Sequence, residues 1–287
     1  MKPNTLLRKS ALSNFLSKPV KIVVLAVILI SVLFPLYWLV INSFKMEQDY
    51  FAQPPVMFPH PGTLKNFVDI FQKYQLARGF RNSFLIAGLT TVCTVFFGSL
   101  ASYSLINGFL PRKIKGFLSS WFLIQKMYPA VVIAVPVFFV ISRLKLMDNI
   151  LALVVMNTSF NLPLVILLMN GYYQEAPYEV EEQSMLDGCD LWQRYFHITT
   201  PMTKAGLVAV GMLTFVASWN EFLYAVILTI SKAKPLTVII AGFITDKGLA
   251  WGPMAAMSCV VILPVLILMW TMQRDFISGM SAGALKG

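Results

Sequence analysis

The chain has 287 residues, of which 57% are hydrophobic and 13% are charged. A soluble domain carries about 25% charged residues, so this composition excludes an ordinary soluble domain and predicts a protein that crosses a membrane several times. The net charge of +10 would suit nucleic acid, but the basic residues cluster beside apolar runs. We therefore interpret them as signals for orientation in a membrane and expect no nucleic-acid partner.

Six apolar runs are long enough to cross a bilayer, which takes about 20 helical residues. We expect these spans at about 20–44, 82–106, 117–141, 150–172, 205–230 and 250–272. The first run has no cleavage site of the kind that follows a signal peptide, so it is expected to remain as a span. The sequence thus predicts an all-α membrane protein with six transmembrane helices in one domain, 1–287.

Three segments carry further structural signals. The segment from Leu64 to Tyr74 spaces its apolar residues three and four apart, which predicts a helix lying on the membrane surface. The second run is rich in glycine, alanine, serine and threonine, the small residues that let helices pack closely in lipid. In the third run, Pro129 and Pro136 predict kinks or locally unwound backbone.

Basic residues in the short loops indicate which side of the membrane faces the cytoplasm. With six spans, both termini lie on one side. The basic residues on that side are Lys2, Arg8, Lys9, Lys18, Arg112, Lys113, Lys115, Arg274 and Lys286. Cytoplasmic loops carry an excess of lysine and arginine, so we expect both termini and the polar loop at 175–201 in the cytoplasm.

The loop at 175–201 is acidic, although it lies between two apolar runs. Its first sixteen residues hold four glutamates and two aspartates. A helix is expected over 178–186, a turn at Gly188, and a second helix over 191–197 that opens with a capping box. The residues expected on one apolar side of that second helix are Leu191, Trp192, Tyr195 and Phe196. Such a helix–turn–helix would fit a groove on a partner protein; packing only on its own bundle is the alternative.

This loop resembles the EAA loop of permease subunits of binding-protein-dependent ABC importers. The family pattern is E-A-A, three residues, G, nine residues, then I-x-L-P. The residues that match it are Glu182, Gly188, Ile198 and Pro201, and those that depart from it are Gln183, Ser184 and Thr200. The departures leave the helix–turn–helix pattern intact.

Other segments are similar to the sugar-importing branch of that family, whose chains tend to end in Q-R, a glycine, then T/S-A-G-x-x-K-G. The matching segments are Gln273-Arg274, Gly279, the run from Ser281 to Gly287, Trp219-Asn220-Glu221 and Asn82-Ser83. The likeness covers nearly the whole chain and looks closest to the maltose-permease type.

The resemblance implies a transporter subunit of the bacterial inner membrane that is driven by a separate motor. A dimer of ATP-binding subunits would dock on the loop, and a second homologous permease chain would complete the path through the lipid. A periplasmic or extracellular solute-binding protein would deliver substrate. The chain has no Gly-x-x-x-x-Gly-Lys-Ser/Thr loop for phosphates, so we expect no cofactor and no enzyme activity in it, with ATP bound by the partner subunits.

The resemblance also assigns roles within the loop. Glu182 would be a polar contact to the ATPase, and Gly188 would form the turn. The further residues expected to couple the loop to the ATPase are Trp192, Ile198 and Pro201.

Polar residues inside spans usually face a pathway or a partner helix because they are costly in lipid. Lys126, with Gln125 and Tyr128 beside it, is the sharpest path candidate; a structural role or pairing with the second permease chain is the alternative. If Lys126 lines the path, an anionic sugar such as a uronate would suit it. Weaker candidates, each of which could equally be a packing residue, are Asn157, Asn161, Trp219, Asn220, Glu221 and Tyr224.

Two other classes of protein compete with this interpretation. A stand-alone secondary transporter would normally show internal repeats and charged relays, and it gives the EAA-like loop no role. A membrane-embedded enzyme needs a metal cluster or a nucleophile–base pair. The histidines, His60 and His197, lie in different loops, and Cys93, Cys189 and Cys259 have no metal or disulfide spacing. We therefore expect neither a metal nor catalytic residues.

Overall fold

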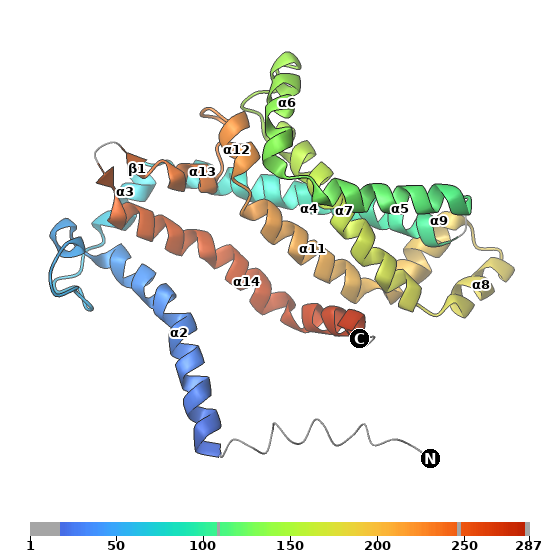
Figure 1. Cartoon of the computed structure of the whole chain (residues 1–287), viewed down its shortest axis with the longest axis horizontal. Coiled ribbons are helices and arrows are strands. Elements are labelled where there is room, and N and C mark those ends of the chain that lie inside the picture. The colour runs from blue at the N-terminus through green and yellow to red at the C-terminus, as the bar shows by residue number, and fades with distance from the viewer. Residues whose placement is uncertain (1–17, 108–109, 246–247, 285–287) are drawn as a thin grey trace.

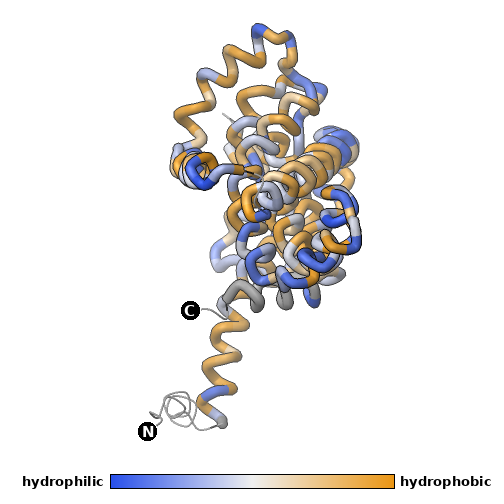
Figure 2. Tube along the Cα trace, turned by 90° about the vertical axis from the view of Figure 1, so that its right-hand side faces the viewer, coloured by the Kyte–Doolittle hydropathy of each residue, from blue (hydrophilic) through white to orange (hydrophobic). Residues whose placement is uncertain are grey.

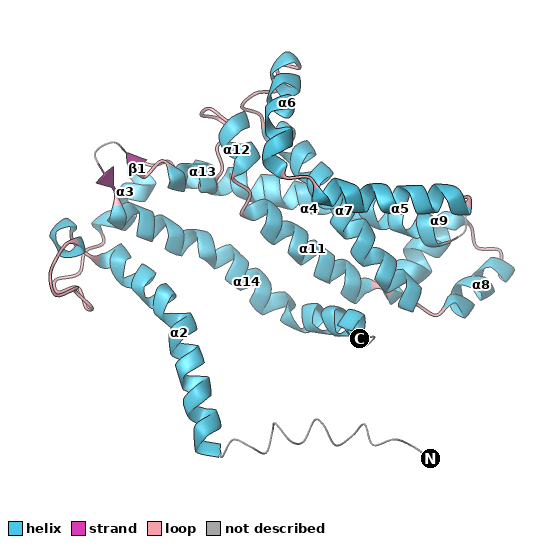
Figure 3. Cartoon of the chain, in the orientation of Figure 1, coloured by secondary structure: helices cyan, strands magenta, loops and turns pink. Residues whose placement is uncertain are grey.

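The computed structural model describes residues 18–107, 110–245 and 248–284, which form a bundle of long helices joined by short elements (Figure 1). The long helices are α2 (Lys18–Phe44), α4 (Leu76–Ile106), α5 (Arg112–Met127), α6 (Ala130–Arg143), α7 (Ile150–Glu175), α11 (Lys204–Trp219) and α14 (Trp251–Ala284). The short elements are η1 (Glu47–Tyr50), α3 (Lys65–Gln72), α8 (Tyr178–Leu186), α9 (Leu191–Gln193), η2 (Arg194–Thr199), α10 (Thr200–Met202), α12 (Leu223–Leu228), α13 (Leu236–Ala241), β1 (Ile244–Thr245) and β2 (Gly248–Leu249). The two strands pair antiparallel, and Figure 3 shows that helix dominates the chain.

Within the described residues, four helices are each long and apolar enough to cross a membrane alone. They are Pro19–Phe44, Leu76–Ile106, Ile150–Glu175 and Trp251–Arg274. Two bent pairs, α5 with α6 and the 191–202 segment with α11, raise the number to six if each pair counts as one span. An all-α membrane fold is therefore correct.

The third apolar run, expected as one span over 117–141, is two helices in the structure. The axes of α5 and α6 differ by 95°, and the backbone of Tyr128 and Pro129 between them is extended. Proline lacks the N–H that a continuing helix needs, and it disfavours helical backbone in the residue before it. The interruption predicted from Pro129 is confirmed, whereas Pro136 lies inside α6.

The fifth run, expected as one span over 205–230, is also interrupted. α11 ends at Trp219, and α12 begins at Leu223. In the gap, the Glu221 carboxylate accepts hydrogen bonds from the backbone N–H groups of Tyr224 (2.7 Å) and Ala225 (3.1 Å). A side chain that satisfies the first free N–H groups of a helix stabilises a new helix start, so the expectation of one continuous span was wrong here.

The sixth expected span, 250–272, agrees with the candidate span Trp251–Arg274. The helix that contains it, α14, continues beyond the span to Ala284. The polar residues that follow 272 end the apolar run without breaking the helix, since the segment contains no proline. The helix expected within 64–74 is present as α3.

The bundle is held together by close packing of α4 against α7. At Gly98 of α4, an added Cβ would lie 2.6 Å from a methyl group of Val165 in α7, so only glycine permits this approach. Ser102 of α4 donates a 2.7 Å hydrogen bond to Asn170 of α7. The prediction that small residues in the second run allow close helix packing is confirmed.

The outer surface of the bundle is apolar, as expected for helices that face lipid. The most apolar stretch of α2 has no buried residue, and this helix projects away from the bundle toward its N-terminal end (Figure 1). Figure 2 shows hydrophobic residues along the helix nearest the N-terminus and along much of the bundle, and many large hydrophobic side chains of α2, α4 and α6 are exposed. Exposure of such a surface to water would be unfavourable, whereas in a bilayer the surface contacts apolar lipid chains.

Candidate functional site

The 175–201 loop forms the expected helix–turn–helix at one end of the bundle (Figure 1). α8 ends in a reversal in which the N–H of Gly188 bonds to Met185 and that of Cys189 bonds to Ser184. Gly188 has a φ of +85°, the left-handed region that glycine adopts without a steric penalty. The glycine turn predicted from the sequence is therefore confirmed.

The second half of the loop opens with the predicted capping box. The Asp190 carboxylate accepts from the N–H of Gln193 (2.8 Å), and the Gln193 side chain accepts from the N–H of Asp190 (2.9 Å). Beyond this point the expected α-helix over 191–197 gives way to η2, a π-helical turn. The i to i+5 bonding of a π-helix changes which side chains share a face.

That change divides the aromatic side chains of the loop between two directions. Tyr195 is buried, and its hydroxyl shares a 2.6 Å hydrogen bond with Ser99 of α4. Trp192 and Phe196 stay exposed and stack, with ring centroids 5.9 Å apart and planes 17° apart. The expectation that Leu191, Trp192, Tyr195 and Phe196 form one apolar side was wrong, since Tyr195 points into the bundle.

Neighbouring glutamates of α8 have opposite environments. Glu182, the expected contact to a partner, is exposed. Glu181 is buried and accepts hydrogen bonds from the Tyr103 hydroxyl (2.6 Å) and the Asn107 side-chain amide (2.7 Å). The buried guanidinium of Arg194 lies 3.8 Å from the same carboxylate.

Glu181 therefore joins three parts of the protein, namely α8, η2 and the end of α4. With the Tyr195–Ser99 bond it makes a second link between the loop and α4. Tyr103 also packs edge-on against Tyr195, with centroids 5.2 Å apart. Sequence reasoning missed Glu181 because nothing in an E-E pair shows which carboxylate turns inward. The later Arg194 was the only available hint of a buried counter-charge.

The remaining loop candidates occupy intermediate positions. Ile198 is half-buried and lines a cavity of about 190 Å³ beside Glu181, while Pro201 is exposed at the start of α10. The surface that the loop leaves accessible thus includes Glu182, Trp192, Phe196 and Pro201. It combines an acidic group, an aromatic stack and a rigid proline, which suits docking into a groove.

The path candidates of the third run lie at the α5–α6 break. Lys126 and Tyr128 are exposed there, and Gln125 is half-buried with a long 3.4 Å bond to the carbonyl of Ser159. Lys126 has no ion pair among the described residues. Glu221, one of the weaker path candidates, has its carboxylate bound to the α12 backbone.

Most of the weaker path candidates are packing residues in this conformation. Trp219 is 2% exposed and donates to the carbonyl of Val261 (3.2 Å). Tyr224 is buried, donates to the carbonyl of Ala130 (3.0 Å) and lies against the ring of Phe160. Neither ring presents a face on which a sugar could stack.

The asparagine candidates divide between buried and exposed positions. Asn157 and Asn161 are buried and donate back to carbonyls of their own helix, at 3.0 Å and 2.8 Å. Asn220 donates in the same way to Val216 (2.9 Å), but it is exposed at the helix break. Asn220 is therefore the one of the three that can contact a solute in this conformation.

Asp148 organises the opposite end of the bundle from the 175–201 loop. Its carboxylate accepts hydrogen bonds from four consecutive backbone N–H groups, those of residues 230 to 233, at 2.9 to 3.1 Å. Burial would raise the pKa of this carboxyl group, but the four N–H groups outweigh burial and hold the pKa well below its usual range.

Replacing Asp148 with asparagine should loosen the 230–233 segment by about 1–3 kcal/mol, because an amide oxygen cannot receive four N–H donors as a carboxylate does. Hydrogen exchange of the backbone amides at 229–236 measures this loss. Asp69→Asn, which removes an ion pair with the exposed Lys73, is the control and should leave that exchange unchanged. Unchanged protection in Asp148→Asn would contradict the role of the carboxylate.

The same group predicts a pH dependence with a defined sign. Since the folded-state pKa of Asp148 lies below the unfolded value of about 4, its stabilisation is complete above that value. It declines as the pH falls below 4 toward the lowered pKa. Asp148→Asn should lack this acid-dependent component of the exchange.

No group of three or more histidine, cysteine or acidic side chains that could hold a metal ion occurs in the part of the chain that the structure describes. The polar groups of the site are instead arranged for hydrogen bonding and docking.

Comparison with known proteins connects this geometry to a family. The family described as "Binding-protein-dependent transport system inner membrane component" matches residues 94–274. The sulfoquinovosyl glycerol transport system permease protein SmoH of Agrobacterium fabrum is 31% identical over 286 residues, which cover 99% of this chain and 100% of SmoH. The trehalose/maltose transport system permease protein MalG of Thermococcus litoralis is 29% identical, over 89% of this chain and 92% of MalG.

A solved structure shares the fold. It is a bacterial ABC transporter involved in the import of the acidic polysaccharide alginate, and one of its chains superposes with a TM-score of 0.77 at 20% identity. The match covers 91% of this chain and 99% of that chain.

Proposed function

The chain belongs to the family of binding-protein-dependent transport system inner membrane components, and on that premise we propose that it forms half of the translocation path of an ABC importer for a sugar or oligosaccharide. It is a multi-pass protein of the inner membrane and works with ATPase and substrate-binding partners. A second, homologous permease chain completes the path. The saccharide-derived cargoes in the names of its relatives support the substrate class.

The observation that carries the proposal is the coupling loop. Its exposed groups, Glu182 and the Trp192–Phe196 stack, suit a groove on an ATPase, while Glu181 and Tyr195 fix the loop to α4. A loop held to a long helix transmits displacement to the bundle, which a loosely attached loop cannot do. ATP binds to the partner subunits, because this sequence has no phosphate-binding loop.

The orientation of the chain in the membrane follows from the proposal that the loop docks on the ATPase subunits. Both termini and the coupling loop face the cytoplasm, where the ATPases lie, and the end that holds Asp148, α13 and the β1–β2 hairpin faces outward. In Figure 1, α8 and α9 lie at the end of the bundle opposite α3, α13 and β1.

Co-purification tests the proposal against its main alternative. Affinity purification of a tagged chain from its own host should recover an ATP-binding subunit and a second permease chain. Uptake into proteoliposomes should require all of them together with ATP and the binding protein. Solute exchange catalysed by the purified chain alone would instead identify a secondary transporter.

Lys126 makes an anionic sugar the favoured cargo within this class. It is exposed at the α5–α6 break, close in sequence to the extended backbone of Tyr128 and Pro129, and the described residues provide no counter-charge. An unpaired cation in a span is costly unless it faces water, a partner or a charged solute.

Lys126→Met should therefore lower the uptake of a uronate-type sugar by about tenfold or more, while a neutral sugar of similar size is affected little. A tenfold loss corresponds to about 1.4 kcal/mol, and we attribute this loss to the removal of one charge contact. Initial uptake rates for both sugars in the assembled transporter provide the measurement. Equal effects on the two cargoes would end the assignment and favour pairing of Lys126 with the second permease chain.

A further inference from the structure

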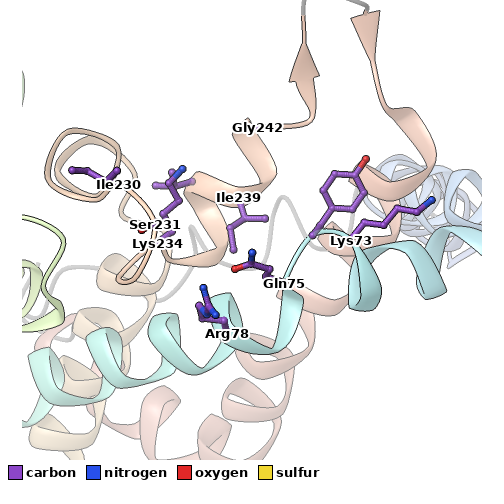
Figure 4. A pocket seen from close by; sticks show the side chains of 10 residues that line it. Lys73, Gln75, Arg78, Ile230, Ser231, Lys234, Ile239 and Gly242 are labelled. Atoms are coloured by element: carbon purple, nitrogen blue, oxygen red, sulfur yellow. The ribbon is translucent and has the colours of Figure 1, made fainter.

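A basic pocket lies at the end of the bundle opposite the coupling loop. It has a volume of about 300 Å³ and lies between the α3–α4 turn, the first turn of α4, the segment after α12, and α13. Figure 4 shows Gln75, the residue before α4, and Arg78, in the first turn of α4, on the side of that helix that faces Ile239 and the segment that carries Ser231 and Lys234. None of the residues assigned to the path or to the coupling loop lines it.

The wall that carries Lys234 is held rigidly. Besides the four N–H bonds to Asp148, the side-chain amide of Asn82 donates to the carbonyls of Lys232 (2.8 Å) and Lys234 (3.0 Å). The N–H of Leu236 bonds to the Ser83 hydroxyl at 2.8 Å. The backbone of this wall is therefore fixed before any ligand arrives, which lowers the entropic cost of binding.

The charges in the pocket are unbalanced. Lys73, which extends away from the other basic side chains in Figure 4, is paired with Asp69 at 2.7 Å. Among the residues that the structure describes, Arg78 and Lys234 form no ion pair. The nearby Asp148 carboxylate is already occupied by backbone N–H groups. Two cations thus remain uncompensated on the outward end, where transport proteins carry fewer basic residues than in the cytoplasm.

We propose that this pocket receives an acidic side chain of the solute-binding protein when that protein docks on the outer face. The guanidinium of Arg78 presents paired donors that match a carboxylate, and the ammonium of Lys234 adds a second positive contact. The pocket has room for an acidic side chain, and no residue of the α5–α6 break lines it. The inference rests on the proposed function, since it requires a binding protein that docks.

The test is binding-protein-stimulated ATP hydrolysis by the complete transporter in nanodiscs. The double variant Arg78→Gln/Lys234→Gln should raise the binding-protein concentration for half-maximal stimulation about tenfold and leave the maximal rate of ATP hydrolysis unchanged. The reason is that a charge contact at a docking surface affects the affinity for the binding protein and not the hydrolysis step. Lys232→Gln is the matched control: its exposed side chain is on the same segment but outside the pocket, so a shift of less than about twofold is expected.

Salt and cargo separate the possible occupants of the pocket. Raising NaCl from about 50 to 300 mM should weaken stimulation of the wild-type transporter, but much less so in the double variant. An unchanged half-maximal concentration in the double variant, or equal shifts in both variants, would overturn the proposal. A shift seen only with an anionic cargo would place the cargo there instead. If the wild-type ATPase did not respond to any binding protein, the proposed function would fail, which is a separate outcome.

Discussion

Gly188→Trp is expected to lower coupled uptake by about tenfold or more, in a chain that still inserts and assembles. Gly188 has a φ of +85°, where a side chain costs about 1–2 kcal/mol of backbone strain, and each 1.4 kcal/mol corresponds to a factor of ten in an equilibrium. An added Cβ at Gly188 would meet no atom of this chain within 4 Å. The indole would therefore project from the turn toward the surface that meets the ATPase.

Gly188→Asn is the matched control, because asparagine tolerates left-handed backbone better than other non-glycine residues. It should keep most of the uptake, whereas the tryptophan variant should hydrolyse ATP without importing substrate. The measurement is the ratio of substrate imported to ATP hydrolysed in proteoliposomes. Normal uptake by Gly188→Trp would remove Gly188 from the coupling mechanism.

Glu181→Leu is expected to detach the coupling loop from α4. It would leave the buried Arg194 guanidinium without its carboxylate and remove the acceptor of the Tyr103 and Asn107 hydrogen bonds. Removing one partner of a buried charge pair costs about 3–5 kcal/mol, which is enough to unfold the loop locally. Coupled uptake should fall to background.

Glu182→Leu is the neighbouring control that separates anchoring from docking. Its carboxylate is exposed and forms no ion pair among the described residues, so hydrogen exchange of the 178–199 amides should match that of the wild type while coupling to the ATPase weakens. Glu181→Leu should accelerate exchange across the same amides. If both variants exchanged alike, Glu181 would not anchor the loop.

In the proposed mechanism, adjacent residues of the loop have different roles, one in anchoring the loop and the other in docking. Glu181 faces the bundle, whereas Glu182 and the Trp192–Phe196 stack face outward; in the proposed mechanism Glu181 transmits force to α4. ATPase subunits that move the exposed surface of the loop would displace α4 only through inward contacts such as those of Glu181. Nucleotide-dependent switching further requires that the ATPase contact the loop differently in its two states.

The sequence alone determined the features that depend on local chemistry. Long apolar runs predicted an all-α membrane fold, and Asp190 with Gln193 identified the capping box. Gly188 marked the turn because only glycine adopts its backbone freely. The missing N–H of Pro129 correctly predicted an interruption in the third run. Each of these outcomes is set by a few neighbouring residues, so one-dimensional reasoning reached them.

Only the tertiary structure decided which polar side chains face inward. Glu181 and Glu182 are chemically identical in the sequence, and their roles separate because Tyr103, Asn107 and Arg194 meet on one side of α8. Asp148 acquires its function from a segment 82 to 85 residues further along the chain. Trp219 and Tyr224 were candidates for the path in the sequence, but long-range packing buries both side chains. Burial and partnership are set by which elements the fold brings together, and that information is not local.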